Sequence, residues 1–258
     1  MSARDSYRIG AIAGIAGAVI TIIASLAIVL GIQDPFGMVS SETYMEGIAE
    51  QRTSWLLVHM VIAVAMLLKL AGMMTLGTVV EGGAARPLSR IGNGLAITGA
   101  TLLLVTMARD GYVHAFITDN WAAAGADSKD VWAANFAVSL RTSYSMEIMS
   151  MLAFVGFAPL AYGAAMLTDS RFPRWLGLLG IFGGLGGVVT ALILFLTGNT
   201  DLGYGVFYPL FVVLVPAVWF IKTALVIIRH SVDDHGLAGP TSGKDALVAS
   251  TPAVATSA

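Results

Sequence analysis

Six long runs of apolar residues divide this chain, and the segments between them are too short for a separate soluble domain. A run of about 18 or more apolar residues predicts a membrane-spanning helix, because a backbone in lipid must satisfy its own hydrogen bonds. The sequence therefore predicts an all-α polytopic membrane protein, a bundle of six transmembrane helices. The expected spans are Ile9–Ile32, Trp55–Val80, Ile91–Ala108, Tyr144–Leu167, Trp175–Leu196 and Val206–Ile228.

Composition agrees with a lipid environment. The chain is 57% hydrophobic and 12% charged, whereas a soluble domain carries about 25% charged residues. The net charge of -2 provides no basic surface for nucleic acid. Because the chain has no cysteine, disulfides, thiolate metal sites and iron–sulfur clusters are excluded. The expected partners are the lipid bilayer and other membrane proteins, or a second copy of the chain.

The basic residues predict an orientation. Loops on the cytoplasmic side of a membrane are enriched in Lys and Arg. One set of loops holds Arg4, Arg8, Arg86, Arg90, Arg171, Arg174, Lys222, Arg229 and Lys244, and the opposite set holds Arg52, Arg109, Lys129 and Arg141. We therefore expect a multi-pass protein of the cell (inner) membrane with both termini in the cytoplasm.

The connecting segments suggest additional short helices on the outer face. Ser40 and Ser41 precede Glu42–Glu50 with the signals of a capped helix. The segment Asp127–Arg141 mixes apolar and polar residues and predicts a helix that leads into the fourth span. We expect residues 1–230 to form the transmembrane domain. The Ala-, Gly-, Ser-, Thr- and Pro-rich residues 231–258 predict a disordered cytoplasmic tail.

Two short stretches carry a family resemblance. The sequence RFPRWLGLLG of Arg171–Gly180 opens the fifth span, and SWLLVH of Ser54–His59 opens the second. With these stretches and its layout, the chain resembles uncharacterised six-helix membrane proteins of bacteria. The resemblance implies a six-helix membrane fold and brings no activity with it.

Four ionisable side chains from three spans are expected in one layer near the outer face: His59, Asp110, His114 and Glu147. Ionisable groups within a membrane are costly, so they are candidates for function. Asp110 and His114 are four residues apart, which places both on one face of a helix. Carboxylate and imidazole ligands suit iron, copper or zinc, so one hypothesis is a transition-metal site formed by all four.

This layer of four side chains has two other interpretations. The four groups can instead form a structural cluster in which Arg52, Arg109 and Arg141 pair with Asp110 and Glu147. A haem with His59 and His114 as axial ligands is not expected, because the predicted depths separate these histidines by ~10 Å along the membrane normal.

Lys69 lies in the middle of the second span, and no acid is expected at its depth. An unpaired ammonium there should face a cavity or a partner, which makes Lys69 a candidate contact for a substrate or a proton. The alternative is a lysine whose stem extends along the helix until its charge reaches the inner interface.

Three classes of function remain open at this level. The first is an integral membrane binding or accessory protein, a class that includes subunits of larger membrane complexes. The second is a membrane-embedded, metal-dependent redox enzyme that uses His59, Asp110, His114 and Glu147. The third is a small-solute or proton-coupled transporter that uses Lys69. The sequence has no nucleotide-binding or nucleophile-elbow motif that would favour an enzyme of another kind.

Overall fold

The computed structural model describes residues 3–31, 41–80, 82–198 and 202–232. These residues form helices and short connections and contain no strand. Six helices are long and apolar enough to cross a membrane, which confirms the expected all-α bundle with six spans. The helices are α1 (Ala3–Gly31), α2 (Ser41–Glu50), α3 (Arg52–Val79), α4 (Ala85–Ala108), η1 (Arg109–Val113), α5 (His114–Ala123), α6 (Ala126–Ser150), η2 (Met151–Phe157), α7 (Ala158–Leu167), α8 (Arg174–Thr197), η3 (Gly203–Leu214) and α10 (Val215–Val232).

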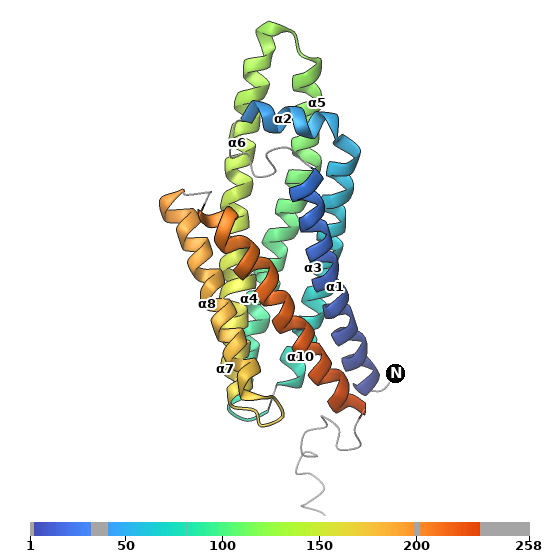
Figure 1. Cartoon of the computed structure of the whole chain (residues 1–258), viewed down its shortest axis with the longest axis vertical. Coiled ribbons are helices and arrows are strands. Elements are labelled where there is room, and N and C mark those ends of the chain that lie inside the picture. Colours follow the sequence, from blue (N-terminus) through green and yellow to red (C-terminus); the bar gives the residue numbers. More distant parts are fainter. Residues whose placement is uncertain (1–2, 32–40, 81, 199–201, 233–258) are drawn as a thin grey trace, which may run out of the picture.

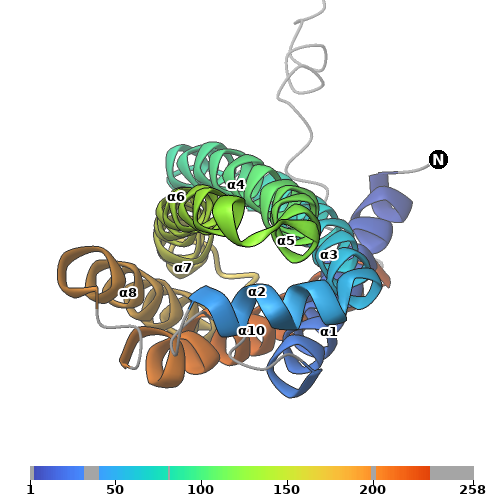
Figure 2. The same cartoon turned by 90° about the horizontal axis from the view of Figure 1, so that it is seen from above.

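The two ends of the bundle differ in construction. At one end, here named the cap end, the hairpin of α5 and α6 projects beyond the other helices and α2 lies across the bundle (Figures 1 and 2). At the other end, the terminal end, α1 begins and α10 finishes (Figure 1). The first and last described residues therefore lie at the same end, as an even number of spans requires. The cytoplasmic location of that end stays a prediction.

The third and fourth spans are much longer than the sequence pattern predicted. The helix that starts at Ala85 continues to Ala123, and the helix from Ala126 continues to Leu167. The predicted helix over Asp127–Arg141 is therefore present as the first part of α6, and the predicted helix after Ser41 is α2. Ser40, Ile32 and most of the predicted tail lie outside the described residues. Three segments, η1, η2 and η3, are π-helical, a form that occurs often at functional sites.

Glycines bring α1 and α3 into close contact in the terminal half of the bundle. A Cβ at Gly72 would lie 2.6 Å from the Cα of Gly14, and a Cβ at Gly17 would lie 2.6 Å from the carbonyl oxygen of Ala65. Any larger residue would push the two backbones apart, so the stripe of small residues on α1 is used within the chain.

The same is true of the glycine-rich α8. One set of its glycines faces α7 and η2, where Gly177 and Gly184 meet the backbone of Gly163 and Gly156. Another set faces the last span, where Gly180 meets Trp219. The indole of Trp219 donates a hydrogen bond of 3.2 Å to the carbonyl of Leu176 in α8. These small-residue faces are thus already occupied by helices of the same chain.

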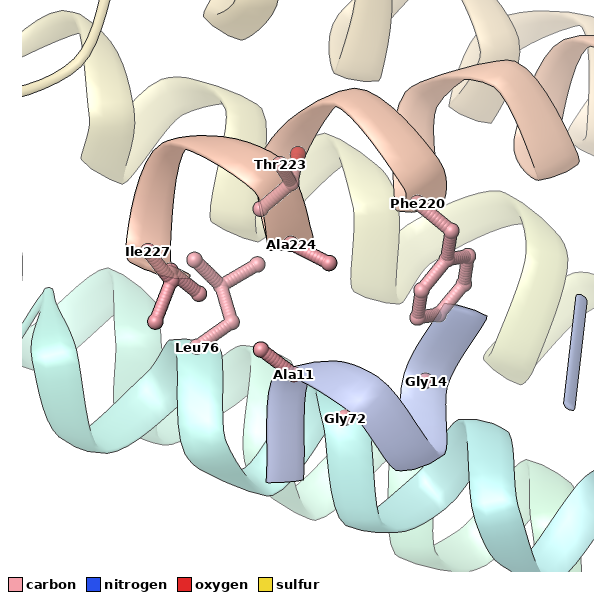
Figure 3. A pocket seen from close by; sticks show the side chains of 8 residues that line it. All are labelled: Ala11, Gly14, Gly72, Leu76, Phe220, Thr223, Ala224 and Ile227. Carbon is pink, nitrogen blue, oxygen red and sulfur yellow. The ribbon is translucent and has the colours of Figure 1, made fainter. Parts of the chain in front are cut away.

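Packing at the meeting of α1, α3 and α10 leaves little space. A void of about 10 Å³ lies between Ala11, Leu76, Phe220 and Ile227 (Figure 3). Thr223 borders it and Figure 3 shows its hydroxyl turned away from Leu76. The void is about the size of one water probe and is lined almost wholly by apolar side chains. It is a packing gap rather than a binding site.

A separate apolar core holds the cap end together. Tyr44, Met45 and Ile48 of α2 are buried against Phe136 of α6 and Trp121 of α5. An ion pair of 2.6 Å between Arg52 and Asp119 adds a link between α3 and α5. These contacts fix α2 across the bundle.

A charged clamp closes the terminal end. Arg171, between α7 and α8, donates hydrogen bonds of 2.7 Å to the Val79 carbonyl of α3 and to Oδ2 of Asp169. Burial acts to raise the pKa of Asp169, but the hydrogen bonds and positive charge of Arg171, with a contribution from His230, outweigh it and hold that pKa below its ordinary value. The clamp therefore connects the second span to the loop before the fifth.

Candidate functional site: an internal cavity lined by ionisable side chains

The cap half of the bundle contains a cavity of about 490 Å³. This volume is within the usual range for a small-molecule site, about 300–1,000 Å³. Its walls come from α1, α3, α4, α6 and all three π-helical segments, and Tyr44 of α2 borders it at the cap end. Its ionisable and aromatic lining residues are Tyr44, Trp55, His59, Lys69, Asp110, Tyr144, Glu147, Phe154, Tyr204 and Tyr208.

Glu147 of α6 lies among three tyrosines. The hydroxyl of Tyr204 in η3 donates a hydrogen bond of 3.1 Å to Oε2 of Glu147. Tyr208, one turn further along η3, is close enough to hydrogen-bond the same carboxylate. The Tyr204 ring centroid is 5.9 Å from that of Tyr144 and 5.5 Å from that of Tyr208. Tyrosine hydroxyls therefore provide hydrogen-bond donors to this carboxylate, and no basic side chain within the described ranges forms an ion pair with it.

The π-helical turn at η1 changes the backbone hydrogen bonding of Asp110. The His114 amide donates to the carbonyl of Arg109 instead of that of Asp110. The Asp110 carbonyl is thereby free to accept a hydrogen bond of 2.6 Å from the indole of Trp55 in α3. Gly111 permits the close approach of η1 to α3, since a Cβ there would lie 2.9 Å from Cβ of His59.

His59 stands beside Trp55 on the same wall of the cavity. Its Nδ1 lies 2.8 Å from the Trp55 carbonyl, and because a carbonyl only accepts, that nitrogen carries a proton. The two rings are in contact, with centroids 4.2 Å apart. His59, Asp110 and Glu147 thus border one cavity, as the predicted layer required.

His114 packs into the cap core and, of the other three predicted ligands, lies beside Asp110. It is fully buried against Phe136 in the cap core, with ring centroids 4.8 Å apart. Its Nδ1 lies 3.5 Å from Oδ1 of Asp110, and neither atom has a hydrogen-bond partner. Among the described residues, no group of three or more His, Asp or Glu side chains is placed to hold a metal ion. The metal site of His59, Asp110, His114 and Glu147 therefore stays a prediction without support from the geometry.

The predicted salt-bridge cluster also does not form within the described part of the chain. Arg52 pairs with Asp119 at the cap. Arg109 donates its Nε proton to the Ser139 hydroxyl at 3.2 Å. Among the described residues, none of Arg52, Arg109 and Arg141 forms an ion pair with Asp110 or Glu147, although Arg109 is close enough for its charge to act on Asp110.

Lys69 borders the deep end of the same cavity. The side chain is 6% exposed, and its Nζ lies 5.5 Å from the ring centroid of Phe154 and 5.9 Å from that of Phe220. No carboxylate within the described ranges forms an ion pair with it. The ammonium therefore lies beside two aromatic rings in the interior of the bundle.

Sequence reasoning missed the tyrosines. Tyr204 and Tyr208 are four residues apart and Tyr144 precedes Glu147 by three, so each pair lies near one helix face. Several tyrosines inside apolar spans, spaced in this way around a carboxylate, were the available signal. What the sequence did not reveal is that two different spans present them to the same space.

The six apolar helices define a polytopic membrane protein, and the ionisable side chains around the cavity define a candidate site inside the bundle. The chain belongs to the family described as "Domain of unknown function (DUF4386)", whose match covers residues 12–226. This confirms the resemblance to an uncharacterised family. Comparison with curated proteins and with solved structures gave no match.

Proposed function

We propose that this protein is an integral membrane binding protein that holds a small amphipathic molecule in the cavity. The observation that carries the proposal is the joint placement of Lys69, Asp110 and Glu147 around a space of about 490 Å³. Apolar side chains such as Met66 and Val155 occupy the remaining walls. A mostly apolar pocket with a few convergent polar groups is typical of small-molecule sites.

The cost of burying charge favours this proposal over a purely structural role. Ionisable side chains at membrane depth are expensive unless they face a partner or a polar cavity. Here the arginines at the cap make other contacts, and Lys69 rests on Phe154 and Phe220. A ligand with polar and apolar parts would satisfy Lys69, Asp110 and Glu147, which form no ion pair with a Lys, Arg, Asp or Glu side chain among the described residues.

A cavity-filling substitution tests the proposal. Leu103 lines the cavity, whereas Leu185 on α8 is 53% exposed on the surface of the bundle. We expect native mass spectrometry of the intact protein, incubated with the neutral amphipathic dye N-phenyl-1-naphthylamine, to detect a one-to-one complex. Leu103→Trp should remove the complex and Leu185→Trp should retain it. Equal retention by both variants, or no complex with the unmodified protein, would refute the proposal.

A transporter is the second candidate, because the cavity reaches along α3 from Trp55 to Lys69, about 21 Å at 1.5 Å per residue. Transport also requires access from the terminal end, where Thr223 borders only the small void of Figure 3. The absence of native cysteine permits a direct test with single cysteines. Ser25→Cys, in the cavity wall, should react with a membrane-impermeant thiol reagent added on the cap side, whereas the buried Ser89→Cys should not.

Alternating access would add a second reactivity. With ligand present, Thr223→Cys should become reactive from the terminal side of a sealed vesicle. A Thr223→Cys protein that never reacts, while Ser25→Cys does, would leave binding as the function and remove transport.

A further inference from the structure

We infer that the cavity binds amphiphiles with a positively charged ammonium head group, which Glu147 and its tyrosines hold while an apolar tail lies along the deeper walls. This inference rests on the proposed binding function and names the chemical class of its ligand. Charge, aromatic geometry and the exposed residues where α1 and η3 border the cavity support this ligand class.

The first argument is the charge around the cavity. Its lining includes two carboxylates, Asp110 and Glu147, and one ammonium, Lys69. With these groups ionised, the lining has a net charge of -1, which one monovalent cation neutralises. Glu147 is close enough to Asp110 for their charges to interact. Oδ1 of Asp110 is buried, makes no hydrogen bond and has the His114 Nδ1 as a neighbour at 3.5 Å, so no charged donor from Lys or Arg satisfies it among the described residues.

The positive and negative groups are also separated. Nζ of Lys69 is beside Phe154, which follows Glu147 by seven residues, or about 10 Å along the helix. No ion pair joins Lys69 to either carboxylate in the part of the chain that the structure describes. The acidic end can therefore attract a cation while the lysine lies at the far, apolar end.

The second argument is the aromatic surround. Tyr144, Tyr204 and Tyr208 all border the cavity around Glu147, with successive ring centroids 5.9 and 5.5 Å apart. Tyr44 and Trp55 border its cap end, with ring centroids 5.7 Å apart. Aromatic faces attract cations through the ring quadrupole, and quaternary ammonium groups are commonly bound by several such rings. An anionic head group would meet both the carboxylates and these negative faces.

The third argument is the route from the lipid phase. One wall of the cavity is the cap half of α1, with Thr21, Ser25 and Leu26, and the opposite wall is η3. Pro209 and Leu210 of η3 are exposed, as is Leu26 of α1. The two helices make few contacts with each other. An amphiphile in the bilayer could therefore enter the cavity between α1 and η3, so that its head group reaches Glu147 and its tail lies along the deeper apolar walls.

The test uses tritiated decyltrimethylammonium and the purified full chain in maltoside micelles. We expect saturable binding that unlabelled decyltrimethylammonium displaces, and that decanoate and decanol of the same tail length do not. Tetraethylammonium, which lacks the tail, should compete weakly. Displacement by dihexanoylphosphatidylcholine would identify a bilayer lipid as the source of the head group, and displacement only by alkylamines would identify a lipophilic amine.

Opposite charge changes provide the decisive comparison. Glu147→Gln should weaken binding about tenfold or more, since it removes a charge-assisted contact from a desolvated site. Lys69→Met should strengthen binding, because it removes a positive charge from the same cavity. Glu46→Gln, the same change at an exposed acid of α2, should have no effect. If Glu147→Gln does not fold, Asp110→Asn should show the same direction of change.

The reverse pattern would overturn the inference. Binding of decanoate that Lys69→Met abolishes would assign an anionic ligand. Equal binding of all three ten-carbon probes would mean that the cavity selects no charge. Both outcomes would leave the proposed binding function intact, provided that Leu103→Trp removes the binding. A cavity that retains neither these probes nor the neutral dye would instead refute the binding function itself.

Discussion

The two halves of the bundle differ in how closely their helices pack. In the terminal half, Gly14 and Gly72 place α1 and α3 in backbone contact, and the space between α1, α3 and α10 is about 10 Å³. In the cap half the same α1 has no glycine between positions 18 and 30. There it forms the wall of a cavity of about 490 Å³. α1 thus packs closely against α3 in the part that contains glycines and forms a cavity wall in the part that does not.

This difference teaches where change should be tolerated. A tight crossing has no room for an added methyl group, whereas a cavity wall has. The buried charged side chains within the spans follow the same division, since Lys69, Asp110 and Glu147 all border the open half. Four substitutions test the comparison, ordered from the largest expected effect to the smallest.

The largest effect is expected at the crossing of α1 and α3. Gly72→Val should destabilise the protein by about 3 kcal/mol, because the new Cβ would meet the backbone of Gly14 and neither helix can yield without unpacking. Unfolding by sodium dodecyl sulfate in mixed micelles, followed by circular dichroism, measures the change. Gly94→Val is the matched control, since a Cβ at Gly94 meets no atom within 4 Å. Similar losses in the two variants would contradict the tight crossing.

The second effect concerns the clamp of the terminal end. Asp169→Asn should cost about 2 kcal/mol at neutral pH, because it removes the charged acceptor of the Arg171 hydrogen bonds. The folded-state pKa of Asp169 lies below its ordinary 3.8, so this stabilisation is complete above that value and is lost as pH falls through the folded pKa.

The pH dependence of the clamp can be read from the same measurement. The difference in unfolding free energy between the unmodified protein and Asp169→Asn should be constant from pH 7 to about pH 5 and shrink below about pH 4. A difference that grows with acidification would have the wrong sign for a depressed pKa and would reject the clamp as the cause.

The third effect tests the acidic side of the cavity. Tyr204→Phe should cost about 1 kcal/mol, because it removes the hydrogen bond to Glu147 and keeps the ring. Tyr112→Phe serves as the control, as Tyr112 is 69% exposed. Equal, negligible changes would show that the Tyr204 hydroxyl contributes nothing to the stability of the cavity wall.

The smallest effect is expected at the open wall of α1. Ser25→Leu adds bulk to a half-buried side chain that borders the cavity, so its cost should stay below about 1 kcal/mol. This is the counterpart of Gly72→Val in the packed half. A loss as large as that of Gly72→Val would mean that the cap half has no spare volume, and the contrast between the halves would fail.

The candidate site was only partly predictable from sequence. Lys69, Asp110 and Glu147 stood out because charges within apolar runs are rare, and the structure brings all three to one cavity. His114 stood out for the same reason, but it packs against Phe136 in the cap core. A four-residue spacing places Asp110 and His114 on one side of a regular α-helix. The two side chains do remain neighbours, with His114 Nδ1 3.5 Å from Oδ1 of Asp110, but no local pattern predicted the π-helical turn at η1 or the burial of His114 in the cap core.

The sequence by itself determined that the chain folds in a lipid environment, that it has six spans, and which charged residues are costly to bury there. These follow from local facts, since an apolar run of sufficient length must satisfy its hydrogen bonds as a helix in lipid. The tertiary structure alone decided that α1 and η3 stand apart at the cap end, and that Tyr204 and Tyr208 meet Glu147 from another span. Such encounters depend on how close each pair of backbones can approach, and that distance is set jointly by residues far apart in the chain, as Gly14 and Gly72 are.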